Sequence, residues 1–174
     1  MSIVENKGFS LVEVMIAVFV LAIGLLGIAG LQLTGMKNNQ TAYVRTQVTL
    51  LATSLADRMR ANIAGAETGD YLIANVVGTN NNCGLGYGTV IVSACSSSNL
   101  AQDDLFRWIE LAKTTVPQPT ASVTCTTPAN VLVVAPTAGI DCPRGSKHTI
   151  TVNWLEHDGT NGLAANGTTL EFQP

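Results

Sequence analysis

The chain has 174 residues, of which 47% are hydrophobic and 12% are charged, with a formal net charge of −3 at pH 7. This length suits one domain of modest size with an additional segment. The hydrophobic content excludes long intrinsic disorder, which requires low hydrophobicity and high net charge. No basic block stands out from the acidic balance, so we do not expect nucleic-acid binding.

The hydrophobic excess lies in one apolar stretch near the amino terminus. Residues Val14–Leu31 contain no polar side chain, and Lys37 is the next charged residue after Glu13. At about 1.5 Å per residue, such a helix nearly spans a hydrocarbon core of about 30 Å. A secretory signal peptide is the alternative, but the stretch is too long for one and no A-x-A cleavage site follows it. We therefore expect a membrane-spanning helix over residues 9–36.

Glu13 is an acidic residue at the start of this helix. A carboxylate inside a spanning helix costs on the order of 3 kcal/mol, so we expect it to have a function. The alternative is a plain membrane anchor in which Glu13 only reaches the lipid headgroups.

The helix is expected to continue beyond the membrane as an amphipathic segment over residues 37–62. Its apolar positions recur at the i, i+4, i+7 spacing of one buried helix face. Gly65 and Gly69 are expected to end the pattern, and Arg58 and Arg60 suit the carboxyl end of the helix dipole. The apolar positions are Val44, Val48, Leu51, Leu55 and Met59.

Residues 63–174 are expected to form an α+β domain, because their composition changes to Thr, Ser, Asn and Gly with short β-branched runs. A second helix is predicted from about Leu100 to Thr115, with Asn99 and Gln102 as its capping arrangement. The predicted strands are Thr89–Ser93, Ser122–Thr126, Val131–Ala135, His148–Glu156 and Thr168–Phe172, and the predicted loops are Tyr71–Asn82 and Gly159–Gly167.

Four cysteines, Cys83, Cys95, Cys125 and Cys142, all follow the apolar helix. They allow three pairings, of which we favour Cys83–Cys95 with Cys125–Cys142, because both bonds close short loops. Zinc binding is the less favoured alternative. No C-x-x-C pair occurs, and neither His148 nor His157 is closely spaced with the cysteines, so we expect no metal site.

No catalytic motif stands out, since the chain lacks G-x-S-x-G, a P-loop and H-E-x-x-H. His157-Asp158 beside Glu156 is interpreted as a solvated strand end. Asp103 and Asp104 are expected in the first turn of the second helix, where acids suit the dipole. The chain is therefore expected to be no enzyme and to bind no cofactor.

The run K-G-F-S-L-V-E-V followed by an apolar helix resembles the class III signal of type IV pilins and type II secretion pseudopilins. The resemblance implies a leader of residues 1–8 that prepilin peptidase removes after Gly8, and N-methylation of the new terminal Phe9. It also implies that Glu13 pairs with the free amine of a neighbouring subunit's Phe9 and so sets the register of assembly. The implied fold is the type IV pilin fold, a long helix packed on a small antiparallel sheet domain with one extra helix.

Four further segments, Ile23–Gly27, Leu31-Gln32, Ala56–Asn62 and Leu100–Trp108, are similar to those of the PilV family of minor pilins. This resemblance implies a role in the initiation or tip complex of a pilus, supporting pilus assembly and adhesion or motility. The implied partners are other minor pilins, the major pilin and a tip adhesin. The implied location is the inner membrane, with a cytoplasmic amino terminus and a periplasmic domain, and then the pilus. The alternatives are a type II secretion pseudopilin and a membrane-anchored periplasmic enzyme.

Overall fold

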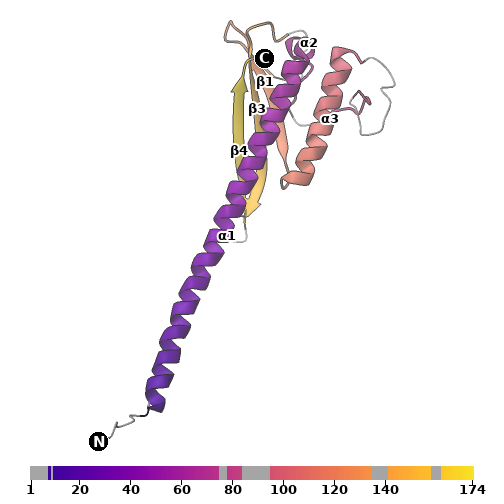
Figure 1. Ribbon diagram of the computed structural model, residues 1–174. Helices are drawn as coiled ribbons and strands as arrows, with labels where there is room; N and C mark the ends of the chain where they lie inside the picture. The colour runs from indigo at the N-terminus through magenta and orange to yellow at the C-terminus, as the bar shows by residue number, and fades with distance from the viewer. Residues whose placement is uncertain (1–7, 9, 75–77, 84–94, 135–140, 158–161) are drawn as a thin grey trace, which may run out of the picture. The chain divides into compact units, whose positions relative to one another are not determined.

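The computed structural model describes residues 8, 10–74, 78–83, 95–134, 141–157 and 162–174. The chain forms two compact units, Met1–Ala42 and Tyr43–Pro174. Helix α1 (Leu11–Ala61) runs through both of them, and the described chain after α1 belongs to the second unit (Figure 1). The predicted Thr89–Ser93 strand lies outside the described residues.

In the first unit, α1 is an isolated helix without a packed face. It begins at Leu11 because the Ser10 carbonyl accepts the backbone N–H groups of Glu13 at 3.0 Å and Val14 at 3.3 Å. Residues 11–40 are all exposed. Within the described chain, α1 is the one helix that is long and apolar enough to cross a membrane.

In the second unit, α1 becomes amphipathic and buries one face. Its buried residues recur at helical spacing, as the sequence pattern predicts: Val48, Leu51, Ala52, Leu55, Ala56 and Met59. These side chains join the hydrophobic core of the domain.

A short helix that the sequence did not predict, α2 (Ile63–Glu67), follows α1 directly. Asn62 caps it, because its side-chain oxygen accepts the Gly65 N–H at 3.3 Å. The expectation that Gly65 ends the helical pattern is therefore wrong. A Cβ at Gly65 would lie 2.6 Å from Nδ2 of Asn62, so the glycine makes room for the cap. Gly69, with φ of 74°, stops the helical chain two residues after α2.

Helix α3 (Ser97–Thr115) begins three residues before the predicted start. Its N-cap is Ser96, whose hydroxyl oxygen accepts the Asn99 N–H at 3.2 Å, and the predicted cap at Asn99 is therefore wrong. Because of this shift, Asp103 and Asp104 lie beyond the first turn, which contains no acidic residue. The end at Thr115 agrees with the prediction, and Pro117 follows.

The four described strands form one antiparallel sheet with the order β2-β1-β3-β4. The strands are β1 (Thr120–Thr126), β2 (Leu132–Val133), β3 (Lys147–His157) and β4 (Leu163–Phe172). Strand β4 begins earlier than predicted, and Leu163 already pairs with His157 of β3. Much of the predicted 159–167 loop is therefore strand, because pairing with the long β3 extends it over residues of low β propensity. The α+β fold with a long amino-terminal helix on a small antiparallel sheet is confirmed.

The core of the domain lies between helices and sheet. Trp108 of α3 is one of its largest buried side chains, and its indole N–H donates to the Leu51 carbonyl of α1 at 2.7 Å. Leu105, Ile109 and Ala112 share the buried face of α3, as the sequence predicts. The sheet contributes Ala121, Val123, Ile150, Val152, Trp154 and Phe172.

Candidate functional site

The segment around the expected cleavage point lies directly before α1. Gly8 is exposed, Phe9 lies outside the described residues, and Ser10 leads into the helix. A Cβ at Gly8 would meet no described atom within 4 Å. The described part of the chain therefore does not require a glycine at position 8. A requirement for glycine would come from a molecule that binds this segment.

Glu13 lies in the first turn of α1, where a negative charge interacts favourably with the helix dipole. Its side chain is exposed and follows the same helix surface as Val14, Ala17, Val18 and Leu21. No basic group among the described residues makes an ion pair with its carboxylate.

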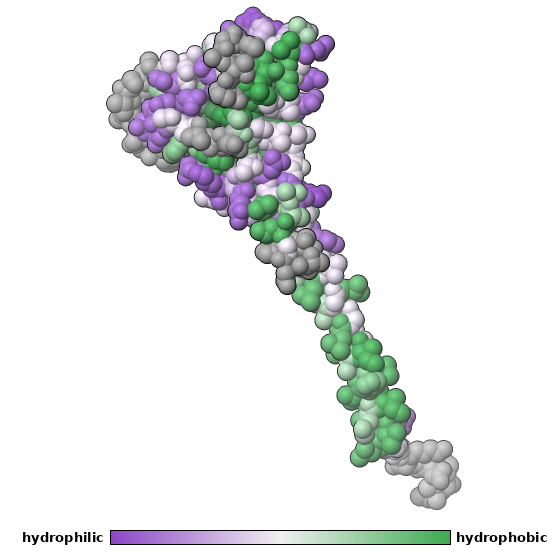
Figure 2. Space-filling view, turned by 180° about the vertical axis from the view of Figure 1, so that it is seen from behind, coloured by the Kyte–Doolittle hydropathy of each residue, from purple (hydrophilic) through white to green (hydrophobic). Residues whose placement is uncertain are grey.

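From Val14 to Leu31, α1 presents an apolar surface on all sides. Figure 2 shows hydrophobic residues gathered along this part of α1, whereas many hydrophilic residues lie on the surface of the second unit. A surface of this kind is stable in lipid or against apolar partners, and far larger than the patches of ordinary soluble monomers. The large exposed side chains are Leu11, Val12, Val14, Met15, Ile16, Val18, Phe19, Val20, Leu21, Ile23, Leu25, Leu26, Ile28, Leu31, Leu33 and Met36.

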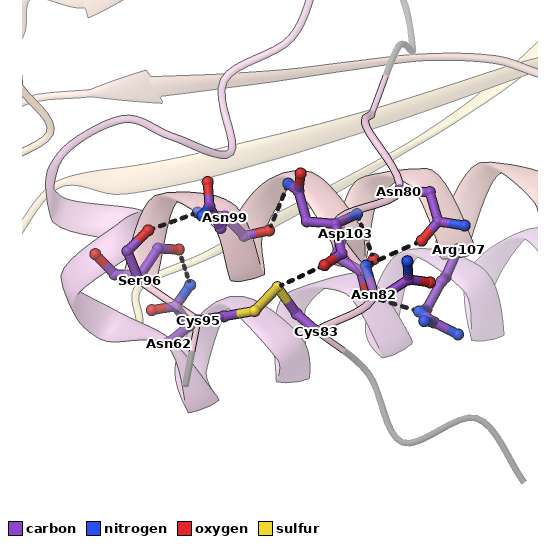
Figure 3. Close-up of a disulfide and its surroundings, with 11 residues drawn as sticks. Asn62, Asn80, Asn82, Cys83, Cys95, Ser96, Asn99, Asp103 and Arg107 are labelled. Atoms are coloured by element: carbon purple, nitrogen blue, oxygen red, sulfur yellow. Dashed lines mark hydrogen bonds and ion pairs between the residues drawn. A yellow bond between two sulfur atoms is a disulfide. The ribbon is translucent and has the colours of Figure 1, made fainter. Parts of the chain in front are cut away.

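A disulfide between Cys83 and Cys95, with Cα atoms 5.8 Å apart, lies beside the start of α3 (Figure 3). The chain before Cys83 follows α3 closely, because the Asn81 N–H donates to Oδ1 of Asp103 at 3.0 Å. The other carboxylate oxygen of Asp103 accepts from Nε of Arg107 at 2.7 Å. Asp103 is buried, and these bonds stabilise its charge.

Gly78 is required where the same segment meets α3. A Cβ at this position would overlap with the backbone nitrogen of Phe106 and the carbonyl oxygen of Gln102. A close approach of two backbones is a position that only glycine fits.

Asp104 is the centre of a hydrogen-bonded cluster that joins α1 to α3. Its carboxylate accepts from Nη1 of Arg58 at 2.9 Å and from the hydroxyl of Tyr71 at 2.7 Å. Asn62 donates to the Tyr71 oxygen at 3.3 Å and to the Ser97 carbonyl at 2.8 Å. Burial and the neighbouring Asp104 carboxylate raise the pKa of Tyr71 well above its ordinary value. The sequence did not reveal this cluster, because its members are far apart along the chain.

The second disulfide joins Cys125 of β1 to Cys142, with Cα atoms 6.3 Å apart. Both cysteines are buried, and the Cys142 N–H donates to the Glu67 carbonyl at 2.8 Å. The structure thus brings together both cysteine pairs that the sequence analysis favoured.

His148 lies beside this second disulfide, although sequence spacing gave no sign of it. The pairing of β1 with β3 places His148 directly opposite Cys125. Its side chain is buried, and burial lowers its pKa, while backbone groups of Ala66 and Ser146 act in the opposite direction. The position of His148 depends on the register between β1 and β3, which cannot be read from the spacing of residues in the sequence.

The residues weighed as a catalytic group do not form a site in the described chain. Glu156 accepts from the side-chain amide of Asn166 at 3.1 Å, and His157 pairs across the sheet with Leu163. Asp158 lies outside the described residues. Glu156 and His157 thus belong to the end of a strand pair.

Residues 5–29 match the family model described as the prokaryotic N-terminal methylation motif. The motif supports a type IV pilin-like protein, that is, a pilin- or pseudopilin-type chain that prepilin peptidase processes and that assembles with other pilins. Families with this motif are in general structural and not enzymatic. The motif and the long apolar helix fit a single-pass anchor in the inner membrane. No curated protein and no solved structure matches the chain significantly.

Proposed function

We propose that this chain is a minor type IV pilin of the PilV kind. The observation that carries the proposal is the continuity of the methylation motif, over residues 5–29, with a 51-residue helix whose second half builds the core of an α+β domain. Such a helix supplies a membrane anchor before assembly and a filament segment afterwards. The similarity of Ala56–Asn62 to the PilV family supports the finer assignment, and Arg58 and Asn62 of this segment hold α3.

Processing removes residues 1–8 and gives Phe9 a free amine, which prepilin peptidase then methylates. The peptidase is the enzyme and this chain is its substrate. An exposed Gly8 directly before the helix suits a protease site at the membrane surface, because a small residue leaves the backbone accessible.

Assembly buries the apolar surface of the first unit against neighbouring pilins. Full burial of one large aliphatic side chain contributes about 1.5–3 kcal/mol relative to water, so many such side chains favour either lipid or a helical bundle strongly. Neither environment favours a lone Glu13 carboxylate, which costs on the order of 3 kcal/mol in a membrane. Pairing with the Phe9 amine of a neighbour removes this penalty in the bundle and so favours one axial register.

The proposed partners are prepilin peptidase, the other minor pilins, the major pilin and a tip adhesin. The chain is first an inner-membrane protein with a cytoplasmic leader and a periplasmic domain, and the two disulfides suit an oxidising compartment. It is then part of the pilus, where it supports initiation and pilus-dependent adhesion or motility. A type II secretion pseudopilin is the alternative, because it shares the same amino-terminal motif.

The processing step is tested by intact-mass analysis of the chain from cells with active prepilin peptidase. We expect a mature chain that begins at a methylated Phe9. Gly8→Leu should leave the longer precursor in the membrane. Gly27→Leu is the matched control, because Gly27 is an equally open position in the helix, and its processing should be normal. A wild-type chain that retains Met1 would contradict the proposal.

The pilus role is separated from the secretion role by deleting the gene. We expect fewer sheared surface pili and unchanged secretion of exported proteins. Normal piliation together with a loss of secretion would identify a pseudopilin instead.

A further inference from the structure

We infer that Cys125, Cys142 and His148 bind a zinc ion when the Cys125–Cys142 disulfide is reduced. The disulfide and the metal would then be two alternative links across the same part of the domain. The inference concerns the second unit alone and does not depend on the proposed role in a pilus.

The three ligand atoms already lie together. The sulfurs of Cys125 and Cys142 and a ring nitrogen of His148 are all within 4.8 Å of one another. Tetrahedral zinc holds sulfur at about 2.3 Å and nitrogen at about 2.0–2.1 Å, so its ligand atoms are roughly 3.5–4 Å apart. Once the S–S bond is broken, the two sulfurs reach this spacing by moving apart while His148 stays beside them.

The backbone holds the ligands in place independently of the disulfide. Cys125 and His148 are paired residues of β1 and β3, two strands in register over seven residue pairs. Cys142 is held from the other side, because its N–H donates to the Glu67 carbonyl at 2.8 Å. Reduction therefore leaves all three side chains attached to a supported backbone.

His148 is placed to act as a metal ligand. Its side chain is 2% exposed, so bulk water does not compete for its ring nitrogens. A metal-bound histidine commonly donates its other ring N–H to a backbone carbonyl, and the backbone of Ala66 and Ser146 interacts with this ring. A metal ion at this point would use one of the two nitrogens.

An adjoining cavity of about 390 Å³ is large enough to supply a water molecule as the fourth ligand. Cys142 and His148 both line it, together with Glu67, Arg144 and Ser146. The Glu67 carboxylate is paired with Nε of Arg144 at 2.8 Å, so the open position suits a water molecule. Two thiolates, one imidazole and one water form a known type of zinc coordination.

The exchange between the two states balances as follows. A dithiol reductant gives two electrons and two protons to the S–S bond, which breaks into two thiols while the dithiol becomes a disulfide. Zn²⁺ then binds both sulfurs as thiolates, and the two protons pass to solvent. In the reverse step a disulfide oxidant accepts two electrons from the two thiolates and becomes a dithiol with two protons from solvent, the Cys125–Cys142 bond forms again and Zn²⁺ is released, so the disulfide and the bound zinc exclude each other.

The Cys83–Cys95 pair is a built-in control. Among the residues that the structure describes, the Cys125, Cys142 and His148 group is the one cluster with metal-ligand spacing. The described surroundings of Cys83–Cys95 are asparagine, serine and the Asp103–Arg107 pair (Figure 3).

The experiment uses the full chain in detergent micelles with Cys83→Ser and Cys95→Ser, so that only one cysteine pair remains. After reduction with a phosphine, we expect one equivalent of Co²⁺ to bind and give thiolate charge-transfer bands and tetrahedral d–d bands that Zn²⁺ removes. The same chain with its disulfide intact should show neither band. Bands in the oxidised chain, or none in the reduced chain, would overturn the inference.

His148→Gln should weaken Co²⁺ binding at least tenfold, while His157→Gln, the matched control, should leave it unchanged. Equal affinity in the two variants would overturn the inference. A further measurement uses the reduced wild-type chain, so that it does not depend on a variant folding. Zn²⁺ should slow alkylation of Cys125 and Cys142 but not of Cys83 and Cys95, and equal slowing of both pairs would also overturn the inference.

Discussion

The charge of Glu13 has different energetic consequences in the membrane and in the proposed filament. Its charge is unfavourable in lipid, yet it lies in the first turn of α1 beside the segment whose processing would create a new amine. If the carboxylate served only as part of an anchor, an apolar residue would serve better. The docking role that we propose for Glu13 would explain why a charge is present at this position.

Glu13→Val is therefore expected to leave insertion and cleavage intact but to reduce incorporation into pili. A docking loss of about 1.4 kcal/mol corresponds to a tenfold change in an equilibrium constant. The measurement is the ratio of this chain in sheared pili to that in membranes. Thr34→Val is the matched control, because it also replaces a polar residue on the exposed part of α1, whose hydroxyl only donates to the Gly30 carbonyl at 3.1 Å. An equal ratio for Glu13→Val and wild type would contradict an assembly role for Glu13.

Tyr71 shows how the buried cluster around Asp104 contributes to stability. Its hydroxyl is shared between Asp104, to which it donates, and Asn62, from which it accepts. Removing one partner from a buried hydrogen bond costs about 1–3 kcal/mol. Tyr71→Phe should therefore lower the free energy of unfolding by this order at neutral pH.

The wild-type chain and Tyr71→Phe should also differ in how their free energies of unfolding respond to alkaline pH. The pKa of Tyr71 is raised in the folded state, so folding favours the neutral phenol, and this stabilisation is complete below pH 10. Above pH 10 the unfolded chain ionises first, and the stability difference between wild type and Tyr71→Phe should narrow. Denaturant titrations of both chains at pH 7 and pH 11 measure this difference in the free energy of unfolding. A stability difference between wild type and Tyr71→Phe that stays constant from pH 7 to pH 11 would contradict the prediction.

At the scale of elements, the long helix could be predicted because its two halves carry strong local patterns. An uninterrupted apolar run defines the first half, and the buried positions from Val48 to Met59 follow the 3.6-residue period. Each half is specified by its own residues. The burial of the second half therefore followed from the sequence without knowledge of its partner.

The start of α3 could not be predicted in the same way. Ser96 and Asn99 are both good N-cap residues, so local chemistry offers more than one start. Contacts with distant segments favour the earlier one: the Ser97 carbonyl accepts from Asn62, and the Ser98 hydroxyl donates to Asp70 at 3.1 Å. Ser96 and Asn99 are equivalent as caps on local grounds, and these long-range hydrogen bonds favour Ser96.

The contacts between residues of different helices and strands were the least predictable part of the candidate site. His148 lies 23 positions after Cys125 in the sequence, yet the two are directly opposite in the sheet. Arg58 and Asp104 are separated by 46 positions. Linear spacing detects metal and catalytic sites only when their ligands share a turn or a helix face, and here strand register and helix packing bring the residues together.

At the scale of the whole molecule, the two units differ in burial: the second unit has a buried core and the first has none. All of the described buried residues lie in the second unit, from Val48 onward, whereas no described residue of the first unit is buried. The first unit therefore adds nothing to the described core, and its apolar surface requires lipid, detergent or other chains. Folding of the domain and anchoring of the chain should be separable.

A fragment of residues 43–174 is therefore expected to be soluble without detergent and to unfold cooperatively. Trp108 and Trp154, 1% and 2% exposed, report on it, because their fluorescence should shift to longer wavelength when the core opens. A fragment of residues 63–174 is the matched control. It lacks Leu55 and Met59, both fully buried, and loss of one such side chain alone costs about 2–5 kcal/mol. The shorter fragment should not fold. A folded 63–174 would show that the second half of α1 does not belong to the domain, and an aggregating 43–174 would contradict the separation of folding from anchoring.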